Sequence, residues 1–298
     1  MELFAPDLPE DFDSFWAEAA AEVRSEPFDF RRSFSNDFDY PGFRVETIDF
    51  RGMGGATLHG WIAYPENAKR LPGFVWIPPY GRESLLPNSY GTRDGMVSLS
   101  LNFFGHEAFY QETYRMERGY MALGVESPES YVFRQMIQNA MIAARVLQSL
   151  PEADEERIGA AGMSQGGGLA IWLGALSPVI RAVCADMPFY CAIRQALGRQ
   201  AYRYPLKELT DFADTIPLGT ERVYNTLSYF DTMHFATRCK VPTQVSYGTK
   251  DPSCRPDQVT SCYEALPGEK RLLVYETGHD WIEDMAPNNL EWFQKTMP

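Results

Sequence analysis

The stretch Arg157-Ile-Gly-Ala-Ala-Gly-Met-Ser-Gln-Gly-Gly-Gly168 contains the pattern Gly-x-Ser-x-Gly at residues 162–166. The small apolar residues before the pattern predict a buried strand, and the apolar run that continues to Leu176 predicts a helix. A strand, a sharp turn and a helix in this order are typical of a nucleophile elbow, in which a strained backbone lifts a serine above the edge of a sheet. Side chains at residues 162 and 166 would clash in such a turn, which explains the two glycines.

The elbow predicts a chemical role for Ser164. Its Oγ would lie at a helix N-terminus, where free N–H groups and the helix dipole stabilise an oxyanion. We therefore expect Ser164 to be the nucleophile of an acyl-transfer reaction. The alternative is a glycine-rich helix that packs closely on a strand and has no catalytic role.

Short strand patterns and helical patterns alternate along most of the chain. Strands are expected at residues 43–50, 58–64, 74–77, 96–101, 157–162, 181–186, 241–247 and 271–275. Helices are expected at residues 11–24, 129–150, 166–176 and 290–297. This alternation predicts an α/β protein with a mostly parallel central sheet flanked by helices. Residues 187–238 interrupt it with a mainly helical pattern, so we expect a single domain over residues 1–298 with a helical insertion after the sixth strand.

The charge balance restricts the partners of this protein. The 298 residues include 27 Lys and Arg against 40 Asp and Glu, which gives a net charge of −13. This charge repels phosphate backbones and anionic bilayers, so neither nucleic acid nor membrane is expected as a main partner. A small neutral substrate is favoured instead. Aromatic residues make up 14% of the chain, and we expect Tyr80, Phe103, Phe104 and Tyr190 on or near loops at a pocket.

A serine hydroxyl needs a general base near neutral pH, and the chain offers His59, His106, His234 and His279. In folds built around this elbow the acid and then the histidine follow the serine along the chain, which excludes His59 and His106. His279 follows the strand expected at 271–275 and lies at the carboxyl end of that strand, where ligands collect in open α/β sheets. His234 lies in the insertion with no strand before it. We expect His279 to be the base; the alternative is a structural histidine.

The acid is expected on the loop after the preceding strand. Asp251, in Gly248-Thr-Lys-Asp251, lies there and precedes His279 by 28 residues. Its carboxylate would fix the tautomer of the imidazole and stabilise the imidazolium. Asp257 is the fallback, and Asp280 is too near His279 along the chain to reach its Nδ1. A turn or capping role is the alternative for Asp251.

An oxyanion hole requires two N–H donors. The backbone N–H of Gln165, the residue after the nucleophile, is the first. The second comes from the loop after the strand expected at 74–77. Pro78 and Pro79 have no N–H, so Tyr80 is the first donor available there.

Cysteines and histidines give no sign of a metal site, disulfide framework or cofactor. The five cysteines are odd in number and none has Cys-x-x-Cys spacing, which favours free buried thiols in a reducing compartment. No histidine pair has the spacing of metal ligands. The N-terminus lacks the basic and apolar regions of a secretory signal, and no stretch of about 18 apolar residues occurs. We therefore expect a cytoplasmic protein.

Several segments together are similar to one known family. They are Asp11-Phe-Asp-Ser-Phe-Trp16, Glu156-Arg-Ile-Gly159, Gly162-Met-Ser-Gln-Gly-Gly-Gly168, Thr226-Leu-Ser-Tyr-Phe-Asp231, Gly248-Thr-Lys-Asp251 and Gly278-His279. On these the chain resembles, over almost its whole length, the acetyl xylan esterase and cephalosporin C deacetylase family of α/β-hydrolases (carbohydrate esterase family 7).

The resemblance implies a fold, an activity and an assembly. It implies removal of acetyl groups from small acetylated sugars, short xylo-oligosaccharides and the side ester of cephalosporin C, by cytoplasmic homohexamers. Residue by residue, it implies the triad Ser164, Asp251 and His279, with Tyr80 and Gln165 as oxyanion donors. The expected reaction is therefore that of a serine esterase working through an acyl-enzyme, on short acyl esters.

The chain departs from the family in two places. Leu101-Asn-Phe-Phe-Gly-His-Glu107 replaces a segment that carries Arg-Gly-Gln in the family, and His279-Asp280 replaces a His-Glu pair. The chain is also shorter between the strand at 96–101 and the helix at 129, so the pocket entrance and oligomer contacts are expected to differ. The alternatives are a carboxylesterase or peptidase of different acyl preference on the same fold, and a non-catalytic binding protein.

Overall fold

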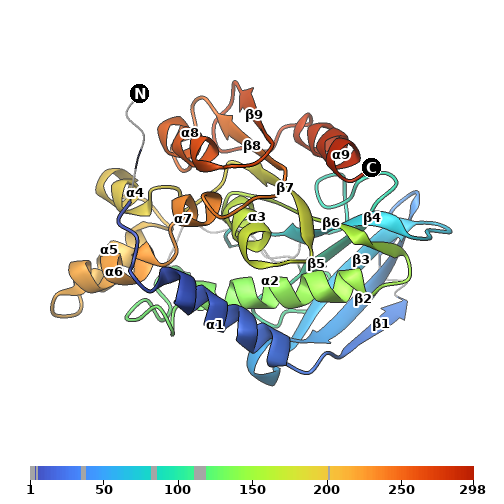
Figure 1. Ribbon diagram of the computed structural model, residues 1–298, viewed down its shortest axis with the longest axis horizontal. Helices are drawn as coiled ribbons and strands as arrows, with labels where there is room; N and C mark the ends of the chain where they lie inside the picture. The colour runs from blue at the N-terminus through green and yellow to red at the C-terminus, as the bar shows by residue number, and fades with distance from the viewer. Residues whose placement is uncertain (1–3, 5, 35–37, 82–85, 111–118, 201) are drawn as a thin grey trace.

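The computed structural model describes residues 4, 6–34, 38–81, 86–110, 119–200 and 202–298 (Figure 1). These residues form a nine-stranded sheet in the order β1-β2-β3-β5-β4-β6-β7-β8-β9. The strands are β1 (Phe30–Phe34), β2 (Phe43–Arg51), β3 (Thr57–Pro65), β4 (Leu71–Ile77), β5 (Val97–Leu101), β6 (Ala153–Met163), β7 (Ile180–Asp186), β8 (Thr243–Gly248) and β9 (Lys270–Tyr275).

The sheet is mostly parallel, as the alternation of strands and helices predicted. Strands β5, β4, β6, β7, β8 and β9 run parallel to their neighbours in that series, whereas β1, β2 and β3 form antiparallel pairs and β3 is antiparallel to β5. A short 3-10 turn, Met53–Gly55, joins β2 and β3 in the expected hairpin. The carboxyl ends of the parallel strands therefore lie along one edge of the sheet, where ligands bind in open α/β folds.

Helices cover both faces of this sheet. They are α1 (Phe12–Ser25), α2 (Val132–Gln148), α3 (Gln165–Leu176), α4 (Ile193–Gln200), α5 (Lys207–Ala213), α6 (Gly219–Ser228), α7 (Thr232–Ala236), α8 (Pro256–Ala265) and α9 (Met285–Thr296). Successive residues of a strand point to opposite faces. Accordingly, Val75 and Ile77 of β4 join the core beneath α1, α2 and α3, and Phe74 and Trp76 join the core beneath α9. This two-sided burial explains why β4 is apolar at consecutive positions.

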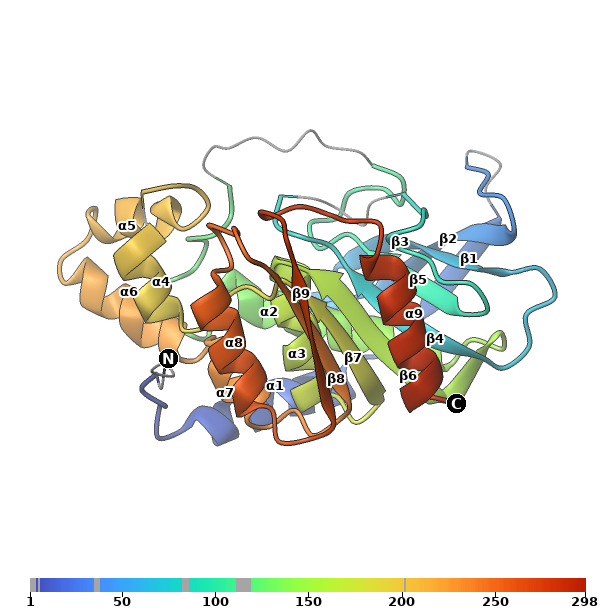
Figure 2. The same cartoon turned by 90° about the horizontal axis from the view of Figure 1, so that it is seen from above.

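The insertion consists of α4, α5, α6 and α7, between β7 and β8. In both views α4, α5 and α6 lie at one end of the molecule, and β1 and β2 lie at the other (Figures 1 and 2). The insertion follows the seventh strand, because β1 raises the number expected from the sequence by one. The sequence of β1, Phe-Arg-Arg-Ser-Phe, gives no strand signal because this edge strand is only partly buried.

Two helices also differ from the expectation. Helix α8 was not anticipated, and α9 begins at Met285, five residues before the predicted start at residue 290. Pro287 lies in the first turn of α9, where a proline is tolerated because the N–H it lacks has no partner within the helix. Across the described residues, helices with enough length and apolar character to cross a bilayer are lacking.

Candidate active site

The elbow forms where β6 ends and α3 begins. Ser164 has φ 57° and ψ −118°, a strained conformation for a residue with a side chain. Its N–H donates to the carbonyl of Asp186 at 2.9 Å, and its own carbonyl accepts from Phe189 N–H at 2.9 Å and Gly168 N–H at 3.0 Å. These bonds fix the backbone of Ser164 to the end of β7, to the segment after β7 and to α3. The side chain of Ser164 takes no part in them.

Both glycines of the motif are required by close backbone contacts. A Cβ at Gly162 would lie 2.5 Å from the carbonyl carbon of Gly166, and a Cβ at Gly166 would lie 2.0 Å from the carbonyl oxygen of Ile77. Real Cβ atoms do not approach backbone this closely, so the elbow and the end of β4 could not both keep their positions with a larger residue.

The substitution Gly166→Ala is therefore expected to lower the free energy of unfolding by about 3 kcal/mol or more, because the backbone of Ile77 cannot move away from the new methyl group without disturbing the end of β4. Urea denaturation followed by circular dichroism measures this change. Gly198→Ala is the matched control: Gly198 lies in α4 with nothing near its missing Cβ, so alanine there should be neutral or slightly stabilising. Equal stability of the two variants would contradict the steric account.

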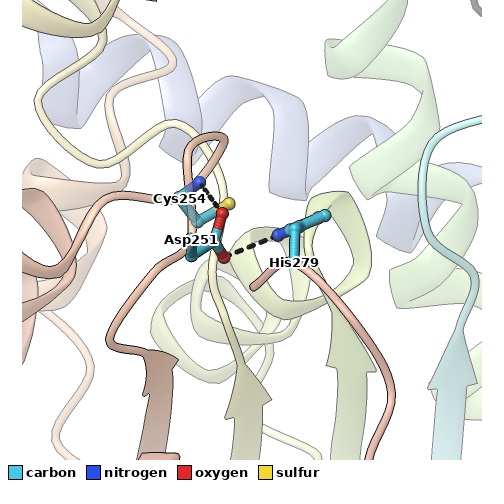
Figure 3. Close-up of side chains that lie close together, drawn as sticks. All are labelled: Asp251, Cys254 and His279. Atoms are coloured by element: carbon cyan, nitrogen blue, oxygen red, sulfur yellow. Dashed lines mark hydrogen bonds and ion pairs between the residues drawn. The ribbon is translucent and has the colours of Figure 1, made fainter. Parts of the chain in front are cut away.

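Ser164, His279 and Asp251 form one chain of hydrogen bonds. His279 Nε2 lies 2.9 Å from Ser164 Oγ, and His279 Nδ1 lies 2.6 Å from Asp251 Oδ2 (Figure 3 shows the second of these). Ser164 comes from the elbow, His279 from the loop after β9 and Asp251 from the loop after β8. Asp251 is fully buried at its side chain, whereas the imidazole of His279 is 24% exposed. The arrangement fits a nucleophile, a base and an orienting acid.

The second oxygen of the acid is fixed by its own loop. Asp251 Oδ1 accepts hydrogen bonds from Ser253 N–H at 2.7 Å and from Cys254 N–H at 2.9 Å. One carboxylate oxygen is therefore fixed to the backbone, and the other faces His279 Nδ1. The proton that they share would lie on Nδ1, which leaves Nε2 as an acceptor for the serine proton.

The other candidate residues are placed elsewhere. His234 Nε2 lies 3.1 Å from the carbonyl of Asp7, and its ring packs against Phe12. Burial lowers the pKa of His234 to about 4, so this histidine is a neutral core residue. Asp257 forms ion pairs with Arg199 and Arg255, so its carboxylate is engaged away from His279.

A cavity of 410 Å³ opens beside Ser164 and His279. Its described lining residues are Pro79, Tyr80, Met163, Ser164, Phe189, Arg203, Tyr204, Pro205, Ser253, His279, Asp280 and Trp281. Tyr80 thus lies at the cavity, as an oxyanion donor would. Gln165 is only 2% exposed and lies behind Ser164 as the first residue of α3, where backbone N–H groups have no partner within the helix.

The family profile named acetyl xylan esterase (AXE1) matches residues 5–296. The chain belongs to the acetyl xylan esterase family. It is therefore a carboxylic ester hydrolase, and its mostly parallel sheet with flanking helices is the α/β-hydrolase fold.

Individual acetyl xylan esterases are similar to this chain over nearly its whole length. Acetyl esterase Axe7A of Xylanibacter ruminicola is 23% identical over 311 residues, which cover 98% of this chain and 70% of the relative. The solved acetyl xylan esterase from Paenibacillus sp. R4 is 27% identical, with a TM-score of 0.87 and coverage of 98% and 97% of the two chains. Acylaminoacyl peptidase of Pyrococcus horikoshii, 18% identical with a TM-score of 0.61, shares only the fold, over 87% of this chain and 42% of its own.

Several residues around the site of this acetyl xylan esterase family member escaped the sequence reasoning. Trp281 packs against Trp76 and Tyr90 with tilted rings and forms part of the cavity, as does the insertion segment 203–205. The position of Trp281, two residues after His279, could have indicated that it lies at the cavity. Of the four aromatic residues expected near the pocket, Tyr80 alone is among the described lining residues. Phe103 and Tyr190 belong to the core, and Phe104 packs on Tyr120 with ring centroids 4.5 Å apart.

Cys254 lies beside the acid, and its thiol raises the question of a metal (Figure 3). Donor atoms of Asp251, Cys254 and His279 lie within 4.8 Å of one another. Burial, with the charge of Asp251, raises the pKa of the Cys254 thiol well above its ordinary value. A protonated thiol is a poor ligand and a poor nucleophile. Asp251 accepts hydrogen bonds from His279 and from two backbone N–H groups, and the free electron pair of His279 Nε2 faces Ser164 Oγ. The trio therefore fits a triad better than a metal centre.

Proposed function

We propose that this chain is a serine esterase that removes acetyl groups from small acetylated carbohydrates through an acetyl-enzyme, with Ser164, His279 and Asp251 as its triad. The observation that carries the proposal is the unbroken hydrogen-bonded chain from Ser164 Oγ through His279 to Asp251, of which Ser164 and His279 line a cavity. Membership of the acetyl xylan esterase family supports the acetyl preference.

In the first half-reaction, Ser164 Oγ attacks the acetyl carbonyl carbon while His279 Nε2 takes the hydroxyl proton. The carbonyl oxygen becomes an oxyanion, which accepts hydrogen bonds from the backbone N–H groups of Gln165 and Tyr80. Each such donor contributes about 3 kcal/mol to transition-state stabilisation. His279 then returns the proton to the sugar oxygen as the C–O bond breaks. In the second half-reaction water attacks the carbonyl carbon of the acetyl-enzyme while His279 takes a proton from the water. The bond between this carbon and Ser164 Oγ then breaks, His279 returns the proton to Oγ, and acetate leaves.

The cavity suits a small neutral substrate. The oppositely charged side chains among its described lining residues are Arg203 and Asp280, and aromatic rings and prolines form much of the rest. Sugar faces pack well against such rings, whereas a polyanion would meet the strong negative field of the molecule. We include short xylo-oligosaccharides and the acetyl side ester of cephalosporin C in the proposed substrate range, as for carbohydrate esterase family 7.

The proposed assembly and compartment follow the same resemblance. We propose a cytoplasmic homohexamer, and the five buried free cysteines are consistent with a reducing compartment. Light scattering coupled to gel filtration tests the assembly: a mass near six times 33.9 kDa supports it, and a monomer mass contradicts it.

Acetate release is the test of the proposed activity. Acetylated xylo-oligosaccharides, glucose pentaacetate and cephalosporin C are incubated with the purified protein, and acetate is measured enzymatically. We expect release from at least one of these substrates, and we expect kcat/KM on p-nitrophenyl esters to fall about tenfold or more between acetate and octanoate, because each misfitted methylene group costs about 1–3 kcal/mol.

Other outcomes of this assay point to the alternative functions. A maximum at octanoate would identify a carboxylesterase of different acyl preference. Comparable turnover of acetyl-alanine p-nitroanilide would identify a peptidase. Absence of hydrolysis with every ester would favour a non-catalytic binding protein on the hydrolase fold. The altered segment 101–107 is the observation behind this alternative.

A further inference from the structure

Glu208 is an acidic residue of the insertion that lies buried next to residues 78–81, the start of the loop after β4, which we call the oxyanion loop because it carries Tyr80. Glu208 belongs to α5 and is 2% exposed. Its Oε1 accepts hydrogen bonds from the Tyr80 hydroxyl at 2.6 Å and from Gly119 N–H at 2.7 Å, and its Oε2 accepts from Met121 N–H at 3.0 Å. A buried carboxylate is costly unless it is well hydrogen-bonded, so these three bonds fix α5, the Tyr80 side chain and segment 119–121 in one arrangement.

Tyr120 extends this network to Gln165, the other proposed oxyanion donor. Its hydroxyl donates to Gln165 Oε1 at 2.9 Å and accepts from Gly81 N–H at 3.3 Å. Its ring packs on the ring of Tyr80 with centroids 4.6 Å apart. The side chain of Tyr80 is thus bonded directly to the carboxylate of Glu208, and the side chain of Gln165 is connected to it through segment 119–121.

The oxyanion loop needs such an external anchor. Pro78 and Pro79 cannot donate backbone hydrogen bonds, so the chain that leads to Tyr80 has few ways to fix itself to its neighbours. The Tyr80 hydroxyl provides one. Burial and the carboxylate of Glu208 raise the pKa of Tyr80, so its phenol remains a hydrogen-bond donor. The packing is tight, because a Cβ at Gly119 would lie 2.3 Å from the Tyr80 hydroxyl oxygen.

We propose that Glu208 is a positioning residue for the oxyanion hole: it holds Tyr80 directly, and Gln165 through segment 119–121, in the geometry that the tetrahedral intermediate requires. The inference rests on the proposed esterase function and adds a role that comes from the insertion. The same segment of chain provides Arg203, Tyr204 and Pro205 to the cavity, and Tyr204 donates from its hydroxyl to Asp211 of α5 at 3.0 Å. One short helix therefore supports both the cavity wall and the oxyanion loop.

The substitution Glu208→Gln tests the role with a minimal change of shape. In either orientation of the amide, its NH₂ group faces a backbone N–H, that of Gly119 or that of Met121, so one of the three bonds becomes a repulsion. We expect kcat for p-nitrophenyl acetate to fall about 10- to 100-fold, below the effect of deleting an oxyanion donor, with KM changed less than about threefold.

Two readouts separate positioning from a merely structural role. Rates are expressed per active serine, titrated to completion with a fluorophosphonate, so that an unfolded fraction does not count. The inhibition constant of trifluoroacetone, whose adduct with Ser164 carries an oxyanion, should rise by the same factor as kcat/KM falls. Glu221→Gln, at an exposed site on α6, is the matched control and should keep the wild-type values for both.

A double-mutant cycle provides the second test. Tyr80→Phe removes the hydroxyl that bonds to Glu208 and leaves the backbone N–H in place. If Glu208 acts through Tyr80, the double variant should lose much less than the product of the two single losses. Fully multiplicative losses, or a Glu208→Gln enzyme with wild-type kcat per active serine, would overturn the proposal. Failure of the wild-type protein to hydrolyse any acetyl ester would instead overturn the proposed function.

Discussion

Ser164→Ala is expected to lower kcat for p-nitrophenyl acetate by about 10⁴-fold or more, because it removes the atom that forms the acetyl-enzyme. The remaining activity would come from binding and from the oxyanion donors alone. Initial rates measured by absorbance of p-nitrophenolate, with the variant purified from a host without background esterase, give the ratio. The fold should be unaffected or slightly stabilised, since alanine removes only an oxygen from a strained residue.

Ser14→Ala is the matched control, since Ser14 is exposed on α1 and far along the chain from the elbow. It should keep wild-type kcat. Mass spectrometry adds a direct readout: a fluorophosphonate should add its mass to the wild-type protein and to the control, and leave the Ser164→Ala protein unmodified. Full activity in that variant, or labelling of another serine, would reject Ser164 as the nucleophile.

Asp251→Asn is expected to cost about 10⁴-fold in kcat while leaving the fold intact. The asparagine carbonyl would still accept from Ser253 and Cys254, so its NH₂ group would face His279 Nδ1. Nδ1 would then have to accept a hydrogen bond, and the imidazole proton would move to Nε2. His279 could no longer take the proton of Ser164, so the loss should appear in kcat.

Asp257→Asn provides the comparison, because Asp257 was the fallback acid and is paired with Arg199 and Arg255. Its kcat should stay within about twofold of wild type, as expected for a partly exposed ion pair away from the cavity. The reverse result, with Asp257→Asn inactive and Asp251→Asn active, would reassign the acid.

The sequence could predict that Ser164, Asp251 and His279 lie together because each of them follows a strand. Parallel strands end at one edge of the sheet, so Ser164 after β6, Asp251 after β8 and His279 after β9 had to converge, although 115 residues separate Ser164 and His279. The apolar strand patterns mark these ends clearly. The position of Tyr80 at the cavity follows from the same logic, because it comes in the loop directly after β4.

The remaining features depend on tertiary packing that leaves no local signal. Glu208 has the sequence surroundings of an exposed helical residue, Lys-Glu-Leu, and its carboxylate is bonded by Tyr80, Gly119 and Met121, which come from distant parts of the chain. Tyr190 follows the cavity residue Phe189, and Phe103 follows the end of β5, but a position after a strand or beside a lining residue does not fix the direction of a side chain. Both side chains belong to the core. Strand β1 was missed because its pairing with β2, rather than its own apolar pattern, makes it a strand.

The cavity takes its reactive groups and its outer wall from different parts of the chain. The proposed triad comes from loops at strand ends, whereas Arg203, Tyr204 and Pro205 come from the insertion. Mutation and selection could therefore change the residues of the wall, and the sugars that the cavity accepts, without changing Ser164, His279 or Asp251. If Glu208 positions the oxyanion loop, this variation should not extend to it. Sequence divergence among related enzymes should be extensive across residues 202–206 and should stop at α5, which carries Glu208. An alignment of relatives with different substrate ranges would show whether variation follows this boundary.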